Sequence, residues 1–221
     1  MKIAVMGACG RVGGRIVDEA IMRGHEVVGL GKSLHADANH QMTFTACDLE
    51  EVDKIASAVQ GCEAYVFAVI PAIKGFDKIE KVVRDSMDAC HRSGISRFLI
   101  VGGGCTLLER PGVPRISKNA RRVTHKTNDR IIGSHQVILD MMKGVEDIDW
   151  VIITPPYMEE NIGGRTGKYR VGTDYAVYQW PDRQDIPFHI NCYISMEDFA
   201  VAMVDEIESQ NHHKQRFTVG Y

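Results

Sequence analysis

Residues 2–20, KIAVMGACGRVGGRIVDEA, decide the fold of this chain of 221 residues. A short apolar run at residues 2–6 is followed by Gly7, Gly10 and Gly13, and then by apolar residues with helical spacing. The first glycine permits a sharp turn, the second lets a bound group approach the backbone, and the third lets the helix pack closely on the sheet. This order of strand, glycine turn and helix predicts the start of an α/β unit.

The glycine turn also predicts a binding site. The helix that follows it directs free N–H groups and the positive end of its dipole at the turn, which favours phosphate groups. A glycine turn that binds nothing is the alternative, but the position of this turn directly after an apolar strand favours a dinucleotide. We therefore predict that the pyrophosphate of a dinucleotide lies at this turn.

Apolar runs alternate with helical patterns along most of the chain. The runs typical of strands lie at residues 2–6, 26–30, 42–46, 64–69, 97–101 and 150–154. The patterns typical of helices lie at residues 11–23, 51–59, 77–92 and 129–143. The alternation predicts an α/β fold of the Rossmann type, a doubly wound parallel sheet with right-handed crossovers and with ligands at the carboxyl ends of its strands.

The last quarter of the chain is less regular. Residues 162–171 are rich in glycine and arginine, residues 187–194 are typical of a strand, and residues 216–219 could add a last strand. Ser195 and Asp198 resemble a capping box at the start of a helix with apolar residues every four positions. No linker divides the chain, so we predict a single domain over residues 1–221 with a small C-terminal lobe for a substrate.

Composition and charge disfavour several kinds of partner. The formal net charge is -3 at pH 7 and the pI is about 6.3, which does not favour nucleic acid or an anionic membrane. No apolar run approaches the roughly 20 residues that span a bilayer. No signal peptide is evident after Met1, so a cytoplasmic protein is expected. The six cysteines include no Cys-x-x-Cys pair, and His212 and His213 lack a third ligand nearby in the sequence, so no metal site is expected.

The end of the second predicted strand indicates which dinucleotide binds. NAD-binding sites usually place an Asp or Glu there, which accepts a hydrogen bond from the ribose 2′-hydroxyl. Here the stretch reads VVGLGKS, so Lys32 and Ser33 follow Gly31 and no carboxylate is present. A cation and a hydroxyl suit a 2′-phosphate, so we predict that NADP(H) is preferred over NAD(H). The alternative is that Lys32 is a solvated loop lysine.

Several segments together point to a known family. They are, in order, MKIAVMGACGRVGGRIVDEAIMRGHEVVGL, CDLEEVDKIASAVQGCEAYVFAV, RFLIVGGGCTL, DWVIITPPYM, RTGKYRVGTD, ISMEDFAVAMVDEIE and QRFTVGY. Their content and order resemble the atypical short-chain dehydrogenase/reductase family, in its NAD(P)H-binding, flavin-reductase-like branch. The resemblance implies that Asp48 and Leu49 flank the adenine, and that Ala68 and Val69 pass beside the cofactor ribose.

Two sets of candidate site residues follow from the motifs and the resemblance. The cofactor-binding set is Gly7, Cys9, Gly10, Arg11, Val12, Gly13, Lys32, Ser33, Asp48, Leu49, Ala68, Val69, Gly102, Gly103 and Pro155. The loops after the fourth, fifth and sixth strands are mainly apolar and aromatic, as suits a planar conjugated substrate. The substrate set is Ile70, Cys105, Thr106, Tyr157 and Met158, with Pro71 and Ile73 beside it. A turn-stabilising role for Thr106 and a core position for Tyr157 stay open.

Three further features limit the chemistry. None of the seven tyrosines has a lysine four residues later, so we do not expect alcohol–ketone chemistry by the Tyr-x-x-x-Lys route, a pair that the resembled branch also lacks. His135 and Asp140 share one predicted helix at an unsuitable angular spacing, so they do not predict a catalytic pair. Residues 115–130, RISKNARRVTHKTNDR, are unusually basic, and form either a solvated surface or a site for an anionic substrate or subunit partner.

The sequence thus predicts an NAD(P)H-dependent reductase that transfers hydride to a flavin, quinone or similar conjugated acceptor. Such an acceptor takes hydride at an electron-poor atom and solvent can supply the proton, so the protein mainly positions the reactants and controls water. The expected partner is a small molecule, and a homo-oligomer is left open. The alternative is a non-catalytic NADP(H)-binding redox sensor that acts through a protein partner.

Overall fold

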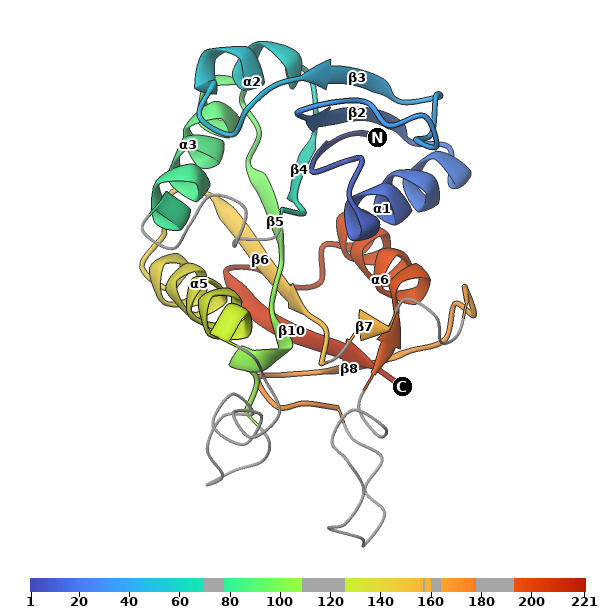
Figure 1. The fold of residues 1–221 in the computed structure, drawn as a ribbon, viewed down its shortest axis with the longest axis vertical. Helices are drawn as coiled ribbons and strands as arrows, with labels where there is room; N and C mark the ends of the chain where they lie inside the picture. Colours follow the sequence, from blue (N-terminus) through green and yellow to red (C-terminus); the bar gives the residue numbers. More distant parts are fainter. Residues whose placement is uncertain (70–77, 109–125, 157, 160–163, 178–192) are drawn as a thin grey trace, which may run out of the picture.

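The fold is a mostly parallel eight-stranded sheet with helices on both faces (Figure 1). The computed structural model describes residues 1–69, 78–108, 126–156, 158–159, 164–177 and 193–221. The strand order is β3-β2-β1-β4-β5-β6-β10-β8, and neighbouring strands are parallel except β10 and β8. The strands are β1 (Lys2–Met6), β2 (Glu26–Gly31), β3 (Thr43–Ala46), β4 (Ala64–Phe67), β5 (Arg97–Val101), β6 (Asp149–Thr154), β8 (Arg170–Gly172) and β10 (Gln215–Gly220).

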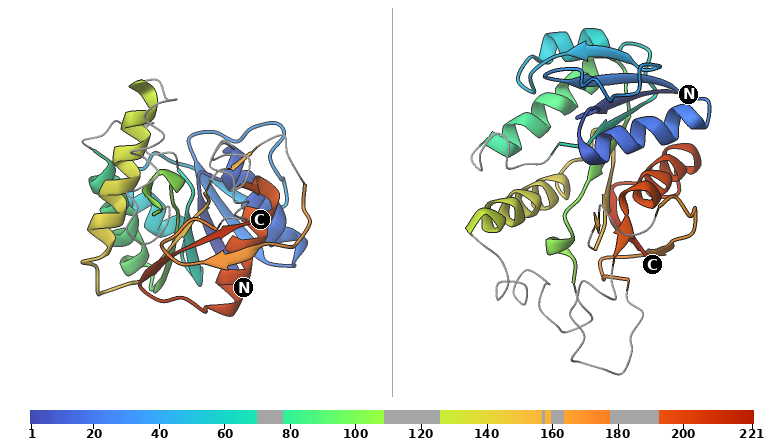
Figure 2. Two further views of the ribbon diagram at one scale, coloured as in Figure 1. Left: turned by 90° about the horizontal axis from the view of Figure 1, so that it is seen from below. Right: turned by 45° about the vertical axis from the view of Figure 1, so that its right-hand side comes forward.

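Helices cover the two faces of the sheet unequally. Helices α1 (Arg11–Met22) and α6 (Met196–Ser209) lie together on one face (Figure 2). The other face is covered by α2 (Val52–Ala58), α3 (Ile79–Arg92) and α5 (Lys126–Met142). Along β1 the side chains alternate, so that Ile3 and Val5 enter the core beneath α1 and α6, while Ala4 and Met6 enter the opposite core. The doubly wound α/β fold is therefore confirmed.

The predicted strands and helices in the first 154 residues end within three residues of those observed. The strand expected at residues 64–69 is shorter, because β4 ends at Phe67. The amide of Ala68 still donates a hydrogen bond to the carbonyl of Met6 (2.9 Å), but its own carbonyl turns beneath the glycine turn. A Cβ atom on Gly7 would lie 2.7 Å from that carbonyl oxygen. The strand ends where the chain has to support the turn.

The last quarter of the chain extends the sheet and adds a second, smaller one. Strand β10 covers the predicted run at residues 216–219 and pairs with β6, and β8 overlaps the end of the stretch at residues 162–171. Strands β7 (Met158–Glu159) and β9 (Ile194–Ser195) form a separate parallel pair. Of the strand expected at residues 187–194, residues 187–192 lie outside the described ranges.

The predicted cap of α6 forms, but only in one direction. The amide of Asp198 donates a hydrogen bond to Ser195 Oγ (3.0 Å). The Asp198 carboxylate does not complete the box, because its Oδ1 accepts hydrogen bonds from the amides of Thr166 and Gly167, both at 2.8 Å. A helix start therefore also anchors a loop some thirty residues earlier in the chain.

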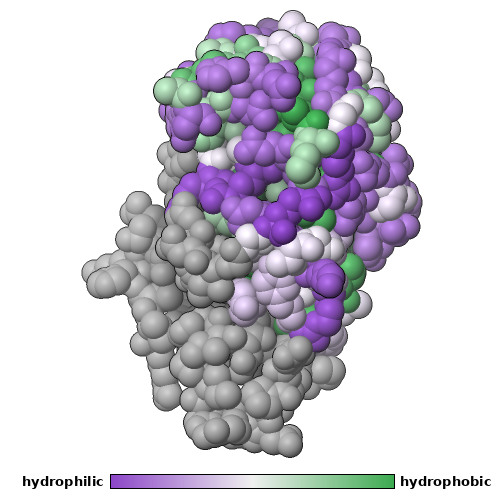
Figure 3. Space-filling view, turned by 90° about the vertical axis from the view of Figure 1, so that its right-hand side faces the viewer, coloured by the Kyte–Doolittle hydropathy of each residue, from purple (hydrophilic) through white to green (hydrophobic). Residues whose placement is uncertain are grey.

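The outer surface over α1 and α6 is mainly hydrophilic (Figure 3). Exposed large apolar side chains are scattered, with Met22 on α1 and Val171 on β8 the most accessible of the described ones. Within the described ranges, no helix has both the length and the apolar character needed to cross a membrane.

Candidate functional site

A cavity of about 670 Å³ opens at the carboxyl ends of β1, β2, β4, β5 and β6. It brings together most of the residues that the sequence predicts for cofactor and substrate. These are Gly7, Cys9, Gly10, Arg11, Val12, Lys32, Ser33, Ala68, Val69, Gly102, Gly103, Cys105, Pro155 and Met158. Carboxyl ends of parallel strands are the place where open α/β sheets hold ligands. The lining runs from the glycine turn after β1 to the loops after β5 and β6.

The glycine turn forms one wall of the cavity. Gly7 has a φ of +88°, which an L side chain rarely adopts, and its amide donates to the carbonyl of Leu30 (2.8 Å). Gly10 precedes α1, and no side chain caps this helix or places a carboxylate in its first turn. The first amides of α1 and the helix dipole are thus available to an anion at the turn.

Gly13 supports the turn from behind and does not line the cavity. A Cβ atom on Gly13 would lie only 2.0 Å from the carbonyl oxygen of Gly7. The absence of a side chain at this position lets α1 pack against the turn, which is the close approach that the sequence predicts for the third glycine.

The loop after β2 supplies the polar part of the cavity. Lys32 and Ser33 line it together with His35. Lys32 is well exposed, and its Nζ lies 3.5 Å from Asp48 Oδ2. The residues implied to flank the adenine do not line this cavity, because Asp48 approaches Lys32 and Leu49 is buried in the core. Their contact with adenine stays a prediction.

The loops after β5 and β6 form the opposite, largely apolar end. They pack so tightly that three successive glycines each leave no room for a side chain. A Cβ atom would lie 2.3 Å from Thr154 Oγ1 at Gly102, 2.3 Å from the ring of His135 at Gly103, and 2.0 Å from the carbonyl oxygen of Pro156 at Gly104. This end of the cavity therefore has a wall whose shape is set by neighbouring elements.

Thr106 lies behind that wall and not in it. The residue ends the short 3₁₀ turn η3 (Gly104–Thr106) and is buried. Its hydroxyl donates to the carbonyl of Gly103 (2.7 Å) and accepts from Arg216 Nη1 (3.1 Å). Thr106 thus stabilises the turn in the described structure, and its placement does not support the contact with substrate that the sequence suggests. The other substrate candidates Ile70 and Tyr157, with Pro71 and Ile73, lie outside the described residues.

Sequence reasoning missed several residues that line the cavity. They are Gly31, His35, Val101, His135, Pro156 and Met196. A sequence signal existed for His135, because it lies three, four and seven residues before Ile138, Leu139 and Met142, which are all buried on one face of α5. Burial lowers the pKa of His135 to about 4, so the ring is neutral near pH 7. Asp140 is exposed and accepts a hydrogen bond from Gln136 (2.7 Å).

Two cysteines line the cavity, and the surroundings of Cys105 differ from those of an activated thiol. Burial raises the pKa of Cys105 to about 11, so it stays protonated near neutral pH. Cys9 lies in the glycine turn and is partly buried. Among the described residues, no cluster of three or more His, Cys, Asp or Glu side chains has the arrangement of a metal site.

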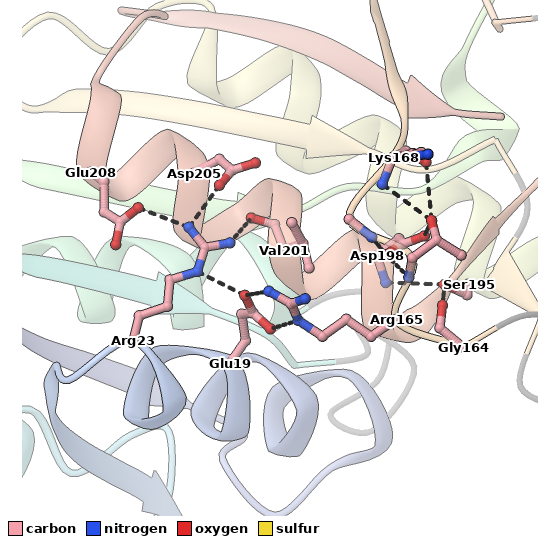
Figure 4. A network of polar contacts seen from close by, with 12 residues as sticks. Glu19, Arg23, Gly164, Arg165, Lys168, Ser195, Asp198, Val201, Asp205 and Glu208 are labelled. Atoms are coloured by element: carbon pink, nitrogen blue, oxygen red, sulfur yellow. Dashed lines mark hydrogen bonds and ion pairs between the residues drawn. The ribbon is translucent and has the colours of Figure 1, made fainter.

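A network of ion pairs holds α1, the helix of the glycine turn, against α6 and the loop before β8 (Figure 4). Glu19 is buried and accepts hydrogen bonds from Arg23 Nε and Arg165 Nε, both at 2.7 Å. Arg23 also contacts Asp205 (2.7 Å) and Glu208 (2.8 Å) on α6. The hydrogen bond from Arg165 is the main cause that lowers the pKa of Glu19, so this carboxylate is ionised where it is buried. The network helps to set the position of α1.

Comparison with known proteins agrees with this geometry. Residues 7–209 match the family model described as NAD(P)H-binding. A crystal structure from Bacteroides thetaiotaomicron described as a "putative epimerase" is 31% identical, with a TM-score of 0.81, and the match covers 100% of this chain and 96% of that one. A "putative exported protein" from Burkholderia pseudomallei is 30% identical, with a TM-score of 0.83 and full coverage of both chains. A "putative NADH-flavin reductase" from Streptococcus pneumoniae, 23% identical with a TM-score of 0.76 and coverage of 100% and 99%, shares the fold.

Proposed function

We propose, because this chain belongs to the NAD(P)H-binding family, that it is an NADPH-dependent reductase whose substrate is a conjugated acceptor such as a flavin or a quinone. The observation that carries the proposal is the cavity, which joins a phosphate-suited glycine turn to a largely apolar end. The cofactor, when bound, supplies a hydride. The chain's own residues then have to hold both reactants and keep water out.

The residues for the cofactor follow the cavity from one end to the other. Gly7, Gly10 and the first amides of α1 are suited to the pyrophosphate. Ala68, Val69, Gly102, Gly103 and Pro155 continue toward the end formed by the loops after β5 and β6. This assignment uses the groove from the topological switch point beside β1, as open α/β sheets commonly do.

The preference for NADPH over NADH rests on the loop after β2. Strand β2 ends at Gly31, and the next two residues are Lys32 and Ser33, both in the cavity wall. Lys32 has an exposed ammonium group that can reach a 2′-phosphate, and Arg11 lies in the same wall. Asp48 lies near Lys32, where it offsets part of the charge. A phosphate that carries about two negative charges gains more from this lysine than a hydroxyl does.

The acceptor is proposed from the chemistry of the apolar end. Val101, Cys105, Pro156, Met158 and Met196 surround it, and the described lining contains no tyrosine–lysine pair. A flavin or quinone needs no such pair, because solvent can deliver the proton after hydride transfer. The name of the Streptococcus pneumoniae structure points to the same class of acceptor, whereas an epimerase would need groups that remove and return a proton.

The function is tested by following NADPH absorbance without oxygen in the presence of FMN, FAD, riboflavin and simple quinones. We expect turnover with at least one of these acceptors. Tight binding of NADPH without turnover of any acceptor would overturn the reductase and favour the non-catalytic sensor. No binding of either reduced coenzyme would overturn both readings.

The coenzyme preference is tested by measuring the dissociation constants of NADPH and NADH for the wild type and for Lys32→Glu. We expect the wild type to prefer NADPH and the substitution to weaken NADPH roughly tenfold or more while NADH changes little. Lys81→Glu on α3, where the lysine is also well exposed, is the control with the same charge change. Equal affinities of the wild type for both coenzymes would remove the preference.

A further inference from the structure

His135 is a polar side chain in the cavity wall that the proposed function does not yet use. It comes from α5, and its ring lies against Gly103 in the loop after β5. His35 and Lys32 serve the other end of the cavity, after β2. In the described lining, His135 is therefore the strongest hydrogen-bonding side chain at the end where the acceptor is proposed to bind.

The ring of His135 has no hydrogen-bond partner among the described residues. Burial alone accounts for the fall of its pKa to about 4, with no contribution from a neighbouring charge or hydrogen bond. The side chain is partly buried, and withdrawal of an unpaired polar group from water costs free energy that an apolar side chain on this face of α5 would not. Unpaired polar groups in a cavity wall are typical of binding sites.

The neighbouring backbone is adapted to the imidazole. A Cβ atom on Gly103 would lie 2.3 Å from Cδ2, 2.4 Å from Cγ and 2.9 Å from Nε2 of His135. A residue with a side chain at position 103 would push the ring out of its place. The middle glycine of the loop after β5 thus lets the ring reach the cavity wall, directly beside residues proposed to hold the cofactor.

We infer that His135 orients the acceptor by a hydrogen bond to a carbonyl or imide group of its conjugated ring, an inference that rests on the proposed reductase function. A neutral imidazole offers one N–H donor and one nitrogen acceptor. The N–H can donate to a carbonyl of a quinone or an imide, or the ring nitrogen can accept from the N–H of an imide. The nearby Cys105 is also uncharged near neutral pH, so this end of the cavity favours uncharged rings over carboxylates.

The role of His135 is one of positioning, because the ring is neutral near pH 7 and is not an imidazolium that could protonate the substrate. A group whose pKa lies well below the working pH is a weak reservoir of protons for general acid catalysis. The inference therefore predicts that kcat/KM for the acceptor depends on the shape and hydrogen bonding at position 135. It also predicts that titration of this residue contributes no pH dependence between about pH 5 and 8.

The test compares His135→Leu and His135→Gln with the wild type. We expect His135→Leu to lower kcat/KM for the acceptor roughly tenfold, and His135→Gln to restore most of it, since one hydrogen bond of ordinary strength is lost and regained. The dissociation constant of NADPH should change less than about twofold. Gln136→Ala is the control on the same helix, because Gln136 contacts Asp140 away from the cavity wall.

Two further measurements separate the inference from its alternatives. His135→Leu should unfold in urea no more easily than the wild type, because leucine removes an unpaired polar group; a large loss of stability would indicate a purely structural role and overturn the inference. A rise in the NADPH dissociation constant with unchanged acceptor kinetics would assign the ring to the cofactor, and also overturns it.

Binding of the acceptor alone distinguishes failure of this inference from failure of the proposed function. Riboflavin and a simple quinone are titrated into protein saturated with NADP⁺, where no turnover occurs, and binding is followed by fluorescence. Weaker binding to His135→Leu than to the wild type supports the inference even if the physiological acceptor has not been tried. Absence of binding to the loaded wild type overturns it, while NADPH oxidation with another kind of acceptor would still leave a reductase.

Discussion

Strands β5 and β6 run side by side through the centre of the molecule, and their two ends are built in opposite ways. At the amino end, Arg97 begins β5 opposite Asp149, which begins β6, and their side chains meet at 2.6 Å. Arg97 also meets the buried Glu206 of α6 at 2.5 Å. At the carboxyl end, the same strands lead into Gly102–Gly103–Gly104 and Pro155–Pro156, which line the cavity.

The difference concerns where polar groups find their partners. At the closed end, Glu206 accepts hydrogen bonds from Arg97 and His212, and His213 contacts Asp149, so these side chains find their partners within the protein. At the open end, the amides of the glycine turn and the ring of His135 face a cavity, where partners have to come from a ligand. Substitutions at the closed end should therefore affect stability, and those at the open end should affect binding.

The largest expected effect comes from Arg97→Met at the closed end. Removal of the arginine leaves Glu206 buried without its main partner, which for a buried ion pair costs about 3–5 kcal/mol of unfolding free energy. Urea unfolding measures the loss, and the NADPH dissociation constant of the folded variant should not change. Arg92→Met, which removes an exposed arginine on α3, is the control and should leave stability unchanged within error. A weaker NADPH affinity in Arg97→Met would contradict the division between the two ends.

Gly10→Val at the open end should show the reverse pattern. The valine side chain would occupy the approach to the glycine turn, so we expect NADPH affinity to fall about 100-fold. The backbone at Gly10 is extended, with a φ of −79°, and a Cβ atom would meet only the carbonyl oxygen of Gly7 at 3.1 Å. The unfolding free energy should accordingly fall by only about 1 kcal/mol, the usual cost of a poor N-cap.

The matched control for this substitution is Gly14→Ala, within the same helix. A Cβ atom there makes an ordinary contact of 3.5 Å with the carbonyl of Ala8. Alanine should raise stability by about 0.5–1 kcal/mol without loss of NADPH affinity. If Gly10→Val, like this control, left NADPH binding intact, the assignment of the pyrophosphate to this turn would fail.

Glu19→Gln tests the network of ion pairs that holds α1 against α6 and the loop before β8. The glutamate has a pKa below its ordinary value of 4.5, with the hydrogen bond from Arg165 as the main cause. The stabilisation that ionised Glu19 contributes to the folded protein is therefore complete above about pH 4.5. It is lost as the pH falls through the pKa of Glu19 in the folded protein. We expect Glu19→Gln to cost about 2 kcal/mol at pH 7 and progressively less below pH 4.5. A difference from the wild type that stays constant across this pH range would exclude the ionised form as the source.

The smallest effect is expected for Thr106→Val, which tests whether Thr106 belongs to the cavity at the open end. The substitution removes hydrogen bonds to Gly103 and Arg216 and should cost about 1 kcal/mol. Because the hydroxyl points away from the cavity, the acceptor kcat/KM measured with NADPH should stay within about twofold of the wild type. A larger loss of kcat/KM with normal NADPH binding would return Thr106 to the substrate site.

The sequence by itself determined the parts of this protein that depend on neighbouring residues. The glycine turn needs only the spacing of Gly7, Gly10 and Gly13, since the turn, the helix start and the close packing all occur within seven residues. The alternation of apolar runs with helical patterns was sufficient to predict the doubly wound sheet. The spacing of apolar residues within each segment indicates by itself whether the segment is a buried strand or a helix with one buried face. Lys32 and Ser33 could be placed at the end of β2 for the same local reason.

Only the tertiary structure decided which distant residues meet. His135 reaches the cavity because Gly103, 32 residues earlier in the chain, has no side chain to exclude its ring. Thr106 lies outside the cavity wall, where Arg216, 110 residues later, donates hydrogen bonds to its carbonyl and its hydroxyl. The carboxylate of Asp198 accepts hydrogen bonds from the loop at Thr166 and Gly167 and does not complete the expected capping box. Such contacts depend on how strands and helices pack across the sheet, and periodicity along one segment carries no information about the side chains of another.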